Sequence, residues 1–98
     1  MKMTAERWMR MYQILYAVEL LVNENRNTSV RGIYEYLKID DLYININLIN
    51  SSIRHYRKIG LIKRNHKPYK RPFQYILTKK GEEQFDWLEF GEYLDYNY

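Results

Sequence analysis

The chain has 98 residues, of which 46 % are hydrophobic and 29 % charged, with a formal net charge of +4. This length fits one domain with a modest core, and the hydrophobic content argues against a disordered chain. The absence of cysteine excludes disulfides, thiolate catalysis and zinc sites that need sulfur ligands. We expect a cytoplasmic protein without a membrane segment, because no apolar run approaches the ~18 residues that span a bilayer and the charged N-terminus lacks a signal-peptide core.

Residues 5–23 are predicted to form a long amphipathic first helix, because apolar residues recur there at three- and four-residue steps after a plausible Thr4 cap. A polar break follows. The second helix is predicted over residues 29–38, with Ser29 at its start as the cap. Gly32 lies inside this helix and weakens it by about 1 kcal/mol relative to alanine.

Residues 46–59 are predicted to form the third helix, with Asn45 or Asn47 as its cap and Gly60 as its C-terminal stop. The connection that precedes it is longer than the turn of the simplest helix-turn-helix. The expected buried stripe of the third helix consists of Ile49, Ile53 and Tyr56. The other side of the helix is polar and basic, and it displays Asn47, Asn50, Ser51, Arg54, His55 and Lys58.

Residues 61–77 are predicted to form a β-hairpin with a long basic tip, in which Pro68 and Pro72 break the strands. Thr78 then caps a last helix over residues 79–94, which Gly91 could end early or kink. The expected fold class is therefore mainly α with one β-hairpin, in the order helix, helix, helix, strand, strand, helix.

Charge is sorted along these elements. Between residues 42 and 81 there is no Asp or Glu, whereas Lys, Arg and both histidines are frequent; from residue 82 onward the sign reverses. Such a chain presents one positive surface, whose usual partner is a polyanion. A solvated lysine-rich face would produce the same pattern, so the position of the cations on the fold decides between the two.

Two stretches carry a resemblance to a known family. Residues 53–64 resemble the end of the recognition helix and the first wing strand in winged-helix regulators of the MarR, PadR and ArsR kind. In those families apolar residues stand four and one before a glycine, as Tyr56 and Ile59 do here, and a Gly-Leu-Ile step leads into the wing. Residues 75–81 are similar to the second wing strand and the next helix, with a Tyr-x-Leu-Thr-x-x-Gly pattern. The two matches cover about residues 28–85 and imply a winged helix-turn-helix fold that binds DNA.

The chemistry of the third helix favours the same function independently. The major groove of DNA admits one helix, and its base edges are read by Arg, Asn, Gln and Ser. We therefore predict DNA contacts from Asn47, Asn50, Ser51, Arg54, His55 and Lys58. Capping or simple exposure would explain the asparagines and the serine as well. Arg57 and Lys58 lie near the helix end, where cations also favour the helix dipole; of these two, only Lys58 is included among the candidates.

The hairpin tip is predicted to grip phosphates or a narrow minor groove, because its cations are dense and its prolines stiffen the loop. The residues concerned are Arg64, His66, Lys67, Tyr69, Lys70 and Arg71. Tyr69 could instead pack on the loop. Ser29 and Arg31 could hold a phosphate at the start of the second helix, although capping explains Ser29 equally.

The last helix has two apolar sides. Phe85 and Leu88 suit the core of the chain itself, whereas Trp87, Phe90 and Leu94 lie on nearly the opposite side and predict a homodimer contact. The first helix folding over both sides would remove the need for a partner. Binding of another protein by the acidic, aromatic C-terminus is a further interpretation.

We expect no enzyme. No nucleophile–base grouping, metal-ligand spacing or glycine-rich phosphate loop can be recognised, so no cofactor is predicted, and nothing marks an effector pocket. The main hypothesis is a sequence-specific, double-stranded DNA-binding transcriptional regulator. The alternatives are a non-specific architectural DNA-binding protein, or a winged-helix module that binds protein or RNA in a larger complex.

Overall fold

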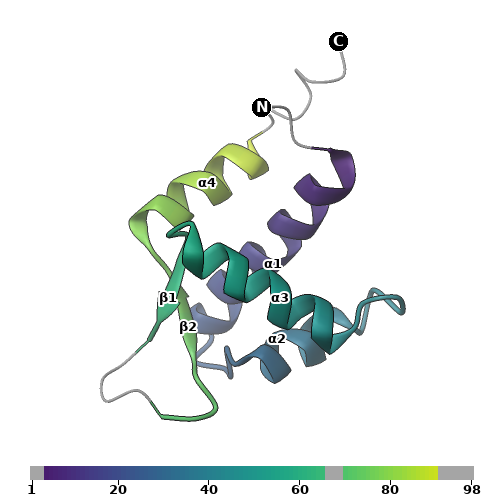
Figure 1. The fold of residues 1–98 in the computed structure, drawn as a ribbon, viewed down its shortest axis with the longest axis vertical. Coiled ribbons are helices and arrows are strands. Elements are labelled where there is room, and N and C mark those ends of the chain that lie inside the picture. The colour runs from purple at the N-terminus through teal and green to yellow at the C-terminus, as the bar shows by residue number, and fades with distance from the viewer. Residues whose placement is uncertain (1–3, 66–69, 91–98) are drawn as a thin grey trace.

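The computed structural model describes residues 4–65 and 70–90 (Figure 1). Its elements are α1 (Ala5–Asn23), α2 (Val30–Leu37), α3 (Ile46–Lys58), β1 (Ile62–Arg64), β2 (Tyr75–Leu77) and α4 (Lys79–Glu89). The two strands pair antiparallel, with Ile62 opposite Leu77 and Arg64 opposite Tyr75. The prediction of a mainly helical α+β chain with one hairpin is thus confirmed, in the predicted order of elements.

The helix starts follow the predicted caps. The side chains of Thr4, Ser29 and Thr78 each accept a hydrogen bond from the backbone N–H three residues later. At α3 the structure decides between the two candidate caps, because Asn45 accepts from the Leu48 N–H. Asn47 therefore has no capping role.

The strands and the last helix are shorter than the sequence pattern predicted. The Leu61 N–H bonds to the carbonyl of Tyr56 at the end of α3 (2.8 Å), so β1 begins only at Ile62. The prediction of helix up to residue 94 is wrong, because α4 ends at Glu89 with Phe90 as its C-cap. A glycine next in the chain favours this stop.

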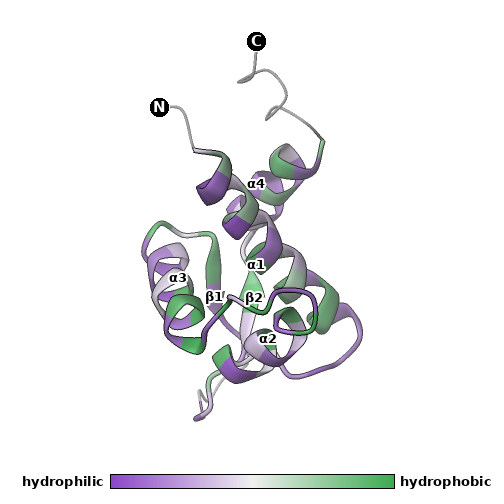
Figure 2. Ribbon diagram, turned by 90° about the vertical axis from the view of Figure 1, so that its right-hand side faces the viewer, coloured by the Kyte–Doolittle hydropathy of each residue, from purple (hydrophilic) through white to green (hydrophobic). Residues whose placement is uncertain are grey.

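The core is built around α1, which contacts α2, α4 and β2. In Figure 2 this helix runs through the middle of the molecule, with α4 above it and α2 below. The largest fully buried side chains come from every helix and from β1: Ile14, Leu15, Val18, Leu21, Ile33, Ile49, Ile53, Ile62 and Leu88. None of the helices in the described ranges combines the length and apolarity of a bilayer-spanning segment.

One junction joins the two sequence stretches that carry the family resemblance. Gly60 has a φ of 84°, a left-handed conformation that favours glycine. The Thr78 hydroxyl donates to the Gly60 carbonyl (2.5 Å), and the Thr78 N–H donates to the Leu61 carbonyl (3.0 Å). A Cβ on Gly81 would lie 2.0 Å from the Leu61 oxygen. These contacts hold the end of α3 against the start of α4.

A second polar set attaches the hairpin to the turn between α1 and α2. The Thr28 hydroxyl, buried with its residue at 2 % exposure, accepts from the Tyr75 N–H (2.9 Å) and donates to Gln74 Oε1 (3.2 Å). The same Gln74 oxygen accepts from the Thr28 N–H (2.7 Å), while its amide nitrogen donates to Asn27 (2.9 Å). These hydrogen bonds fix the position of β2 relative to a turn that lies about 46 residues earlier in the sequence.

Replacing Thr28 tests this attachment. Thr28→Val removes the hydroxyl and leaves the Tyr75 N–H buried without its acceptor, which lowers the free energy of unfolding by about 1–3 kcal/mol. Thr28→Ser keeps the hydroxyl, so it should lower the free energy of unfolding by a smaller amount. Urea unfolding of both variants measures the difference. Equal decreases in the free energy of unfolding would contradict the role assigned to the hydroxyl.

For Gly32 in α2, the structure predicts a change in stability that is opposite in sign to the one helix propensity predicts. A Cβ at Gly32 would lie 2.2 Å from the carbonyl oxygen of Asn27. Propensity alone predicts that Gly32→Ala stabilises by about 1 kcal/mol, whereas the clash predicts a net loss of about 1–3 kcal/mol. Thermal or urea unfolding decides. Glu83→Ala, at an exposed site in α4, is the control and should stay within about 0.5 kcal/mol of the unsubstituted chain.

Candidate nucleic-acid interface

A basic groove lies between the start of α2, the exposed side of α3 and the hairpin. Two adjoining hollows of about 500 and 520 Å³ form it, and both are lined by Arg54, Arg57 and Arg64. Arg31 from α2 and Arg71 from the segment before β2 line the larger hollow. We define the basic groove by these five arginines. Segments separated by up to 40 residues of sequence thus place guanidinium groups on one surface.

Helical spacing decides which α3 side chains face this groove. Asn50, Arg54 and Arg57 follow one another at steps of four and three, which places them on one face of the helix. All three line the larger hollow. Asn47, three residues before Asn50, extends the same stripe and is exposed. The predicted contacts Asn50 and Arg54 are therefore brought together in the groove, whereas Asn47 lies on the same stripe but lines neither hollow.

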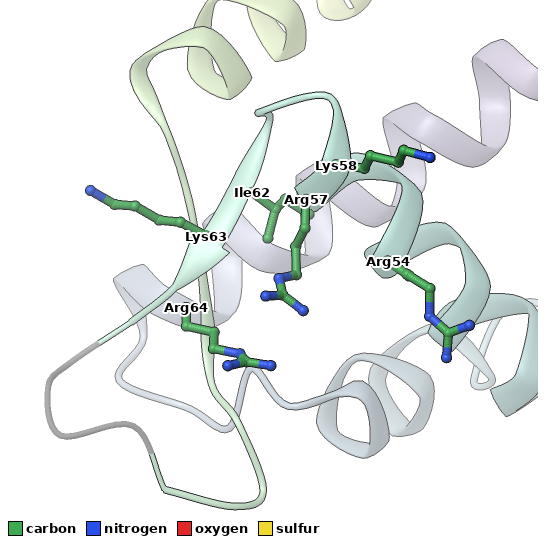
Figure 3. Close-up of a pocket in the computed structure, with 6 residues that line it drawn as sticks. All are labelled: Arg54, Arg57, Lys58, Ile62, Lys63 and Arg64. Atoms are coloured by element: carbon green, nitrogen blue, oxygen red, sulfur yellow. The ribbon is translucent and has the colours of Figure 1, made fainter.

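The remaining predicted contacts of α3 lie on a neighbouring stripe. Ser51, His55 and Lys58 are exposed and are also spaced four and three residues apart. Neither Ser51 nor His55 lines the groove. Lys58 lines only the smaller hollow, and Figure 3 shows its side chain pointing away from Arg57. The sequence prediction thus combined two faces of one helix.

Arg57 and Arg64 approach each other across the groove, from α3 and from β1 (Figure 3). Each is half-buried. Lys63, next to Arg64 on the strand, points to the opposite side of the hairpin. The alternation of side chains along β1 explains this separation. Arg64 therefore lines both hollows of the groove, whereas Lys63 lines only the smaller one.

Aromatic rings of β2 and the segment before it support these guanidinium groups. The Arg64 Cζ lies 3.7 Å from the centroid of the Phe73 ring, and the Arg71 Cζ lies 5.6 Å from the same centroid. The Arg57 Cζ lies 5.9 Å from the centroid of the Tyr75 ring. Cation–π contacts of this kind orient a guanidinium group over the face of a ring.

The charge of the groove is largely uncompensated. In the described part of the chain, no carboxylate lies within salt-bridge distance of Arg54, Arg57 or Arg71. Arg31 differs, since its guanidinium lies 3.4 Å from the Glu35 carboxylate one helical turn later. Like charges held close together raise the local positive potential, which an anion lowers.

Glu35 has a second cationic neighbour. The hydrogen bond from Lys38 and the nearby charges of Lys38 and Arg31 lower the pKa of the Glu35 carboxyl group. Glu35 therefore stays ionised at neutral pH and competes with any external anion for Arg31. Of the five groove arginines, Arg31 is accordingly the weakest candidate for anion binding.

The remaining predicted site residues are Ser29 and those of the hairpin. Ser29 is among the residues that line the larger hollow, but it is only 2 % exposed and its hydroxyl accepts from the Gly32 N–H (3.1 Å), so the capping interpretation accounts for it. Lys70 and Arg71 are exposed. His66, Lys67 and Tyr69 lie outside the described residues.

The predicted dimer residues are also separated by the fold. Trp87 is half-buried and packs against the core, so much of its ring contacts its own chain. Phe90 is 80 % exposed. Leu94 lies outside the described residues.

Sequence reasoning missed Arg57 and the two rings, Phe73 and Tyr75. Arg57 was left out of the candidates because the helix dipole also explains a cation near the helix end, although its position seven residues after Asn50 places it on the same helical face. Tyr75 is buried, and alternation along the strand places Phe73 on the same face. That these rings contact arginines depends on the packing of β1 against both β2 and α3, for which the local pattern contains no signal.

Comparison with protein-family models gives no match to this chain, and comparison with curated proteins finds no similar sequence. The inference of function therefore depends on the geometry and charge of the groove.

Proposed function

We propose that the protein binds double-stranded DNA as a winged helix-turn-helix protein, with α3 in the major groove and the hairpin against the adjacent backbone. The observation that carries this proposal is the basic groove, in which three separate parts of the fold present arginines to one surface. Guanidinium groups bind phosphate through paired, charge-assisted hydrogen bonds. A rigid surface of five such groups fits a regularly charged polymer better than a single small anion.

The groove residues divide into two proposed roles. Arg57 and Arg64 are half-buried and supported by aromatic rings, so they suit phosphates that approach between helix and hairpin. Asn47, Asn50 and Arg54 are exposed on α3 and suit base edges, since Asn pairs with adenine and Arg with guanine. Phosphate contacts fix orientation, and base contacts supply the specificity.

Duplex DNA fits this surface better than duplex RNA. The B-form major groove is about 12 Å wide and admits a helix, whereas the A-form major groove is deep and too narrow for side chains to read. The 13 residues of α3 present polar side chains along one face, and these side chains could reach base edges if the helix enters the major groove.

A homodimer is part of the proposal. Phe90 and Met9 are exposed at 80 % and 46 %. They belong to the region where α4 and the first part of α1 lie, at the end of the molecule away from the hairpin tip (Figure 1). Pairing two chains through this end would leave both basic grooves free for one duplex.

DNA binding is tested by fluorescence anisotropy with a labelled duplex at several salt concentrations. If about six to eight cations contact phosphates, log affinity falls with log salt at a slope of about −5 to −7. Arg57→Gln should weaken binding and reduce the slope by about one, while Arg54→Ala should weaken binding by about 1–3 kcal/mol for preferred sequences only.

Arg26→Gln is the matched control, because Arg26 is an exposed arginine in the turn after α1 that lines neither hollow of the groove and lies away from the proposed dimer contact. Equal weakening by the Arg26 and Arg57 variants would show that net charge, and not the groove, determines affinity. A slope shallower than about −2 would contradict broad phosphate contact. Tighter binding to duplex RNA of the same sequence would overturn the assignment to DNA.

A non-specific architectural role is the second candidate, since cations outnumber the candidate base readers in the groove. Selection of preferred duplexes from a random pool separates the two functions. A sequence-specific dimer yields a palindrome with half-sites about one helical turn apart, or a multiple of it, and Arg54→Ala alters the selected bases. An architectural protein binds tightly but yields no motif.

A further inference from the structure

A third hollow, of about 300 Å³, lies between α1 and the C-terminal end of α2. Three tyrosines line it: Tyr12 and Tyr16 from α1 and Tyr36 from α2. Asp40 and Asp41, from the turn after α2, also line it. It shares no residue with the basic groove, and no Lys or Arg of the described chain lines it. We call it the tyrosine hollow.

The aromatic wall of the tyrosine hollow is held in place by neighbouring rings. Tyr12 stacks on Trp8 and on Phe85, with ring centroids 5.6 and 5.7 Å apart. Tyr16 lies 6.0 Å from Tyr12 and 6.2 Å from Phe85, centroid to centroid. A wall ordered before binding avoids the cost of fixing side chains around a ligand.

The electrostatic environment of the hollow is negative. Burial raises the pKa of the Tyr36 phenol, and the neighbouring Tyr16, Glu24 and Asp40 raise it further, with Arg26 opposing them. Burial and then Glu89 raise the pKa of the Tyr12 phenol. The phenols are therefore neutral at physiological pH, and the carboxylates supply the negative potential.

Tyr36 already contacts one cation of the chain. The Cζ of Arg26 lies 5.8 Å from the centroid of its ring. Cations are attracted to aromatic faces, and the contact with Arg26 shows that the Tyr36 ring accepts a guanidinium group. Arg26 itself does not line the hollow, and neither does any other Lys or Arg of the described residues.

We propose that the tyrosine hollow binds a small organic cation, with its ammonium or guanidinium group against the tyrosines and near Asp40. Aromatic rings and carboxylates together attract a cation with apolar substituents, whereas a neutral molecule of the same shape gains only the apolar contacts. The volume lies at the lower end of the range for small-molecule sites. A metal ion fits less well, because the described residues contain no group of three or more His, Asp or Glu side chains suited to metal binding.

The test is an NMR titration of the full chain with choline and with 3,3-dimethyl-1-butanol, its neutral isostere. We expect amide shifts confined to the neighbourhood of residues 12–16 and 36–41. Choline should bind at least about tenfold more tightly than the alcohol, because only choline has the cation that rings and carboxylates attract. Equal affinity of the two probes, or shifts only elsewhere in the chain, would overturn the proposal.

Substitutions identify the groups responsible. Tyr36→Leu and Asp40→Asn should each weaken choline binding by about fivefold or more, whereas Tyr36→Phe, which keeps the ring, should stay within about twofold. Glu83→Gln on α4, outside the hollow, is the matched loss of one carboxylate and should have no effect. Asp40 is exposed, so its variant keeps the test valid if Tyr36→Leu disturbs folding. Unchanged affinity in Asp40→Asn and Tyr36→Leu would refute the assignment, and none of these results depends on whether the chain binds DNA.

Discussion

The position of the hairpin depends on the hydrogen bonds between Thr28 and the Gln74–Tyr75 pair. Two strands of three residues each are not stable on their own in water. Here the Thr28 hydroxyl and backbone N–H fix β2 against the turn before α2, and the Thr78 hydroxyl fixes the far end of the hairpin to Gly60. Because both ends are attached, Arg64 on β1 faces Arg57 on α3.

The basic groove concentrates positive charge, and in the described part of the chain no carboxylate lies within salt-bridge distance of its Arg54, Arg57 and Arg71. Such an arrangement opposes folding, since like charges approach one another. The rings of Phe73 and Tyr75 offset part of this cost through cation–π contacts with the arginines. A local arrangement that reduces stability is common at sites that act on a partner. In the proposed function that partner is the phosphate backbone of DNA, which makes the same charges favourable.

The proposed sites lie at opposite ends of one short helix. Arg31 near the start of α2 lines the basic groove, and Tyr36 near its end lines the tyrosine hollow. Ile33 between them is fully buried, so α2 is held firmly in the core. A ligand at one end changes affinity at the other only if the helix has two arrangements that the ligand distinguishes. Ile33 is buried in the core, and Gly32 lies close against Asn27. This packing favours a single arrangement of α2, so we expect the two sites to bind their ligands independently.

Local patterns in the sequence were sufficient for the helices, for the caps of α1, α2 and α4, and for the order of elements. Periodicity at three and four residues acts within one helix, and a capping side chain such as Ser29 reaches only three residues ahead, so neither needs the rest of the fold. The stripe of Asn50 and Arg54 was predictable for the same reason. By contrast, the pattern left Asn45 and Asn47 open as the cap of α3, and it placed the end of α4 at residue 94 instead of Glu89, because apolar residues continue beyond Glu89 in the sequence.

Only the tertiary structure decided which cations share a surface. Arg57 and Arg64 lie together because Thr28, Gln74 and Thr78 attach the hairpin across long sequence separations, and Lys58 and Lys63 point away although they are close in sequence. Trp87 packs on its own core for a similar reason. The family resemblance included both Gly60 and Thr78, but their hydrogen bond appears only in three dimensions. Sequence alone therefore determined that the chain has a polar, basic helix followed by a hairpin. Packing determined which of its charges form the groove, because side-chain direction depends on contacts that short-range periodicity does not contain.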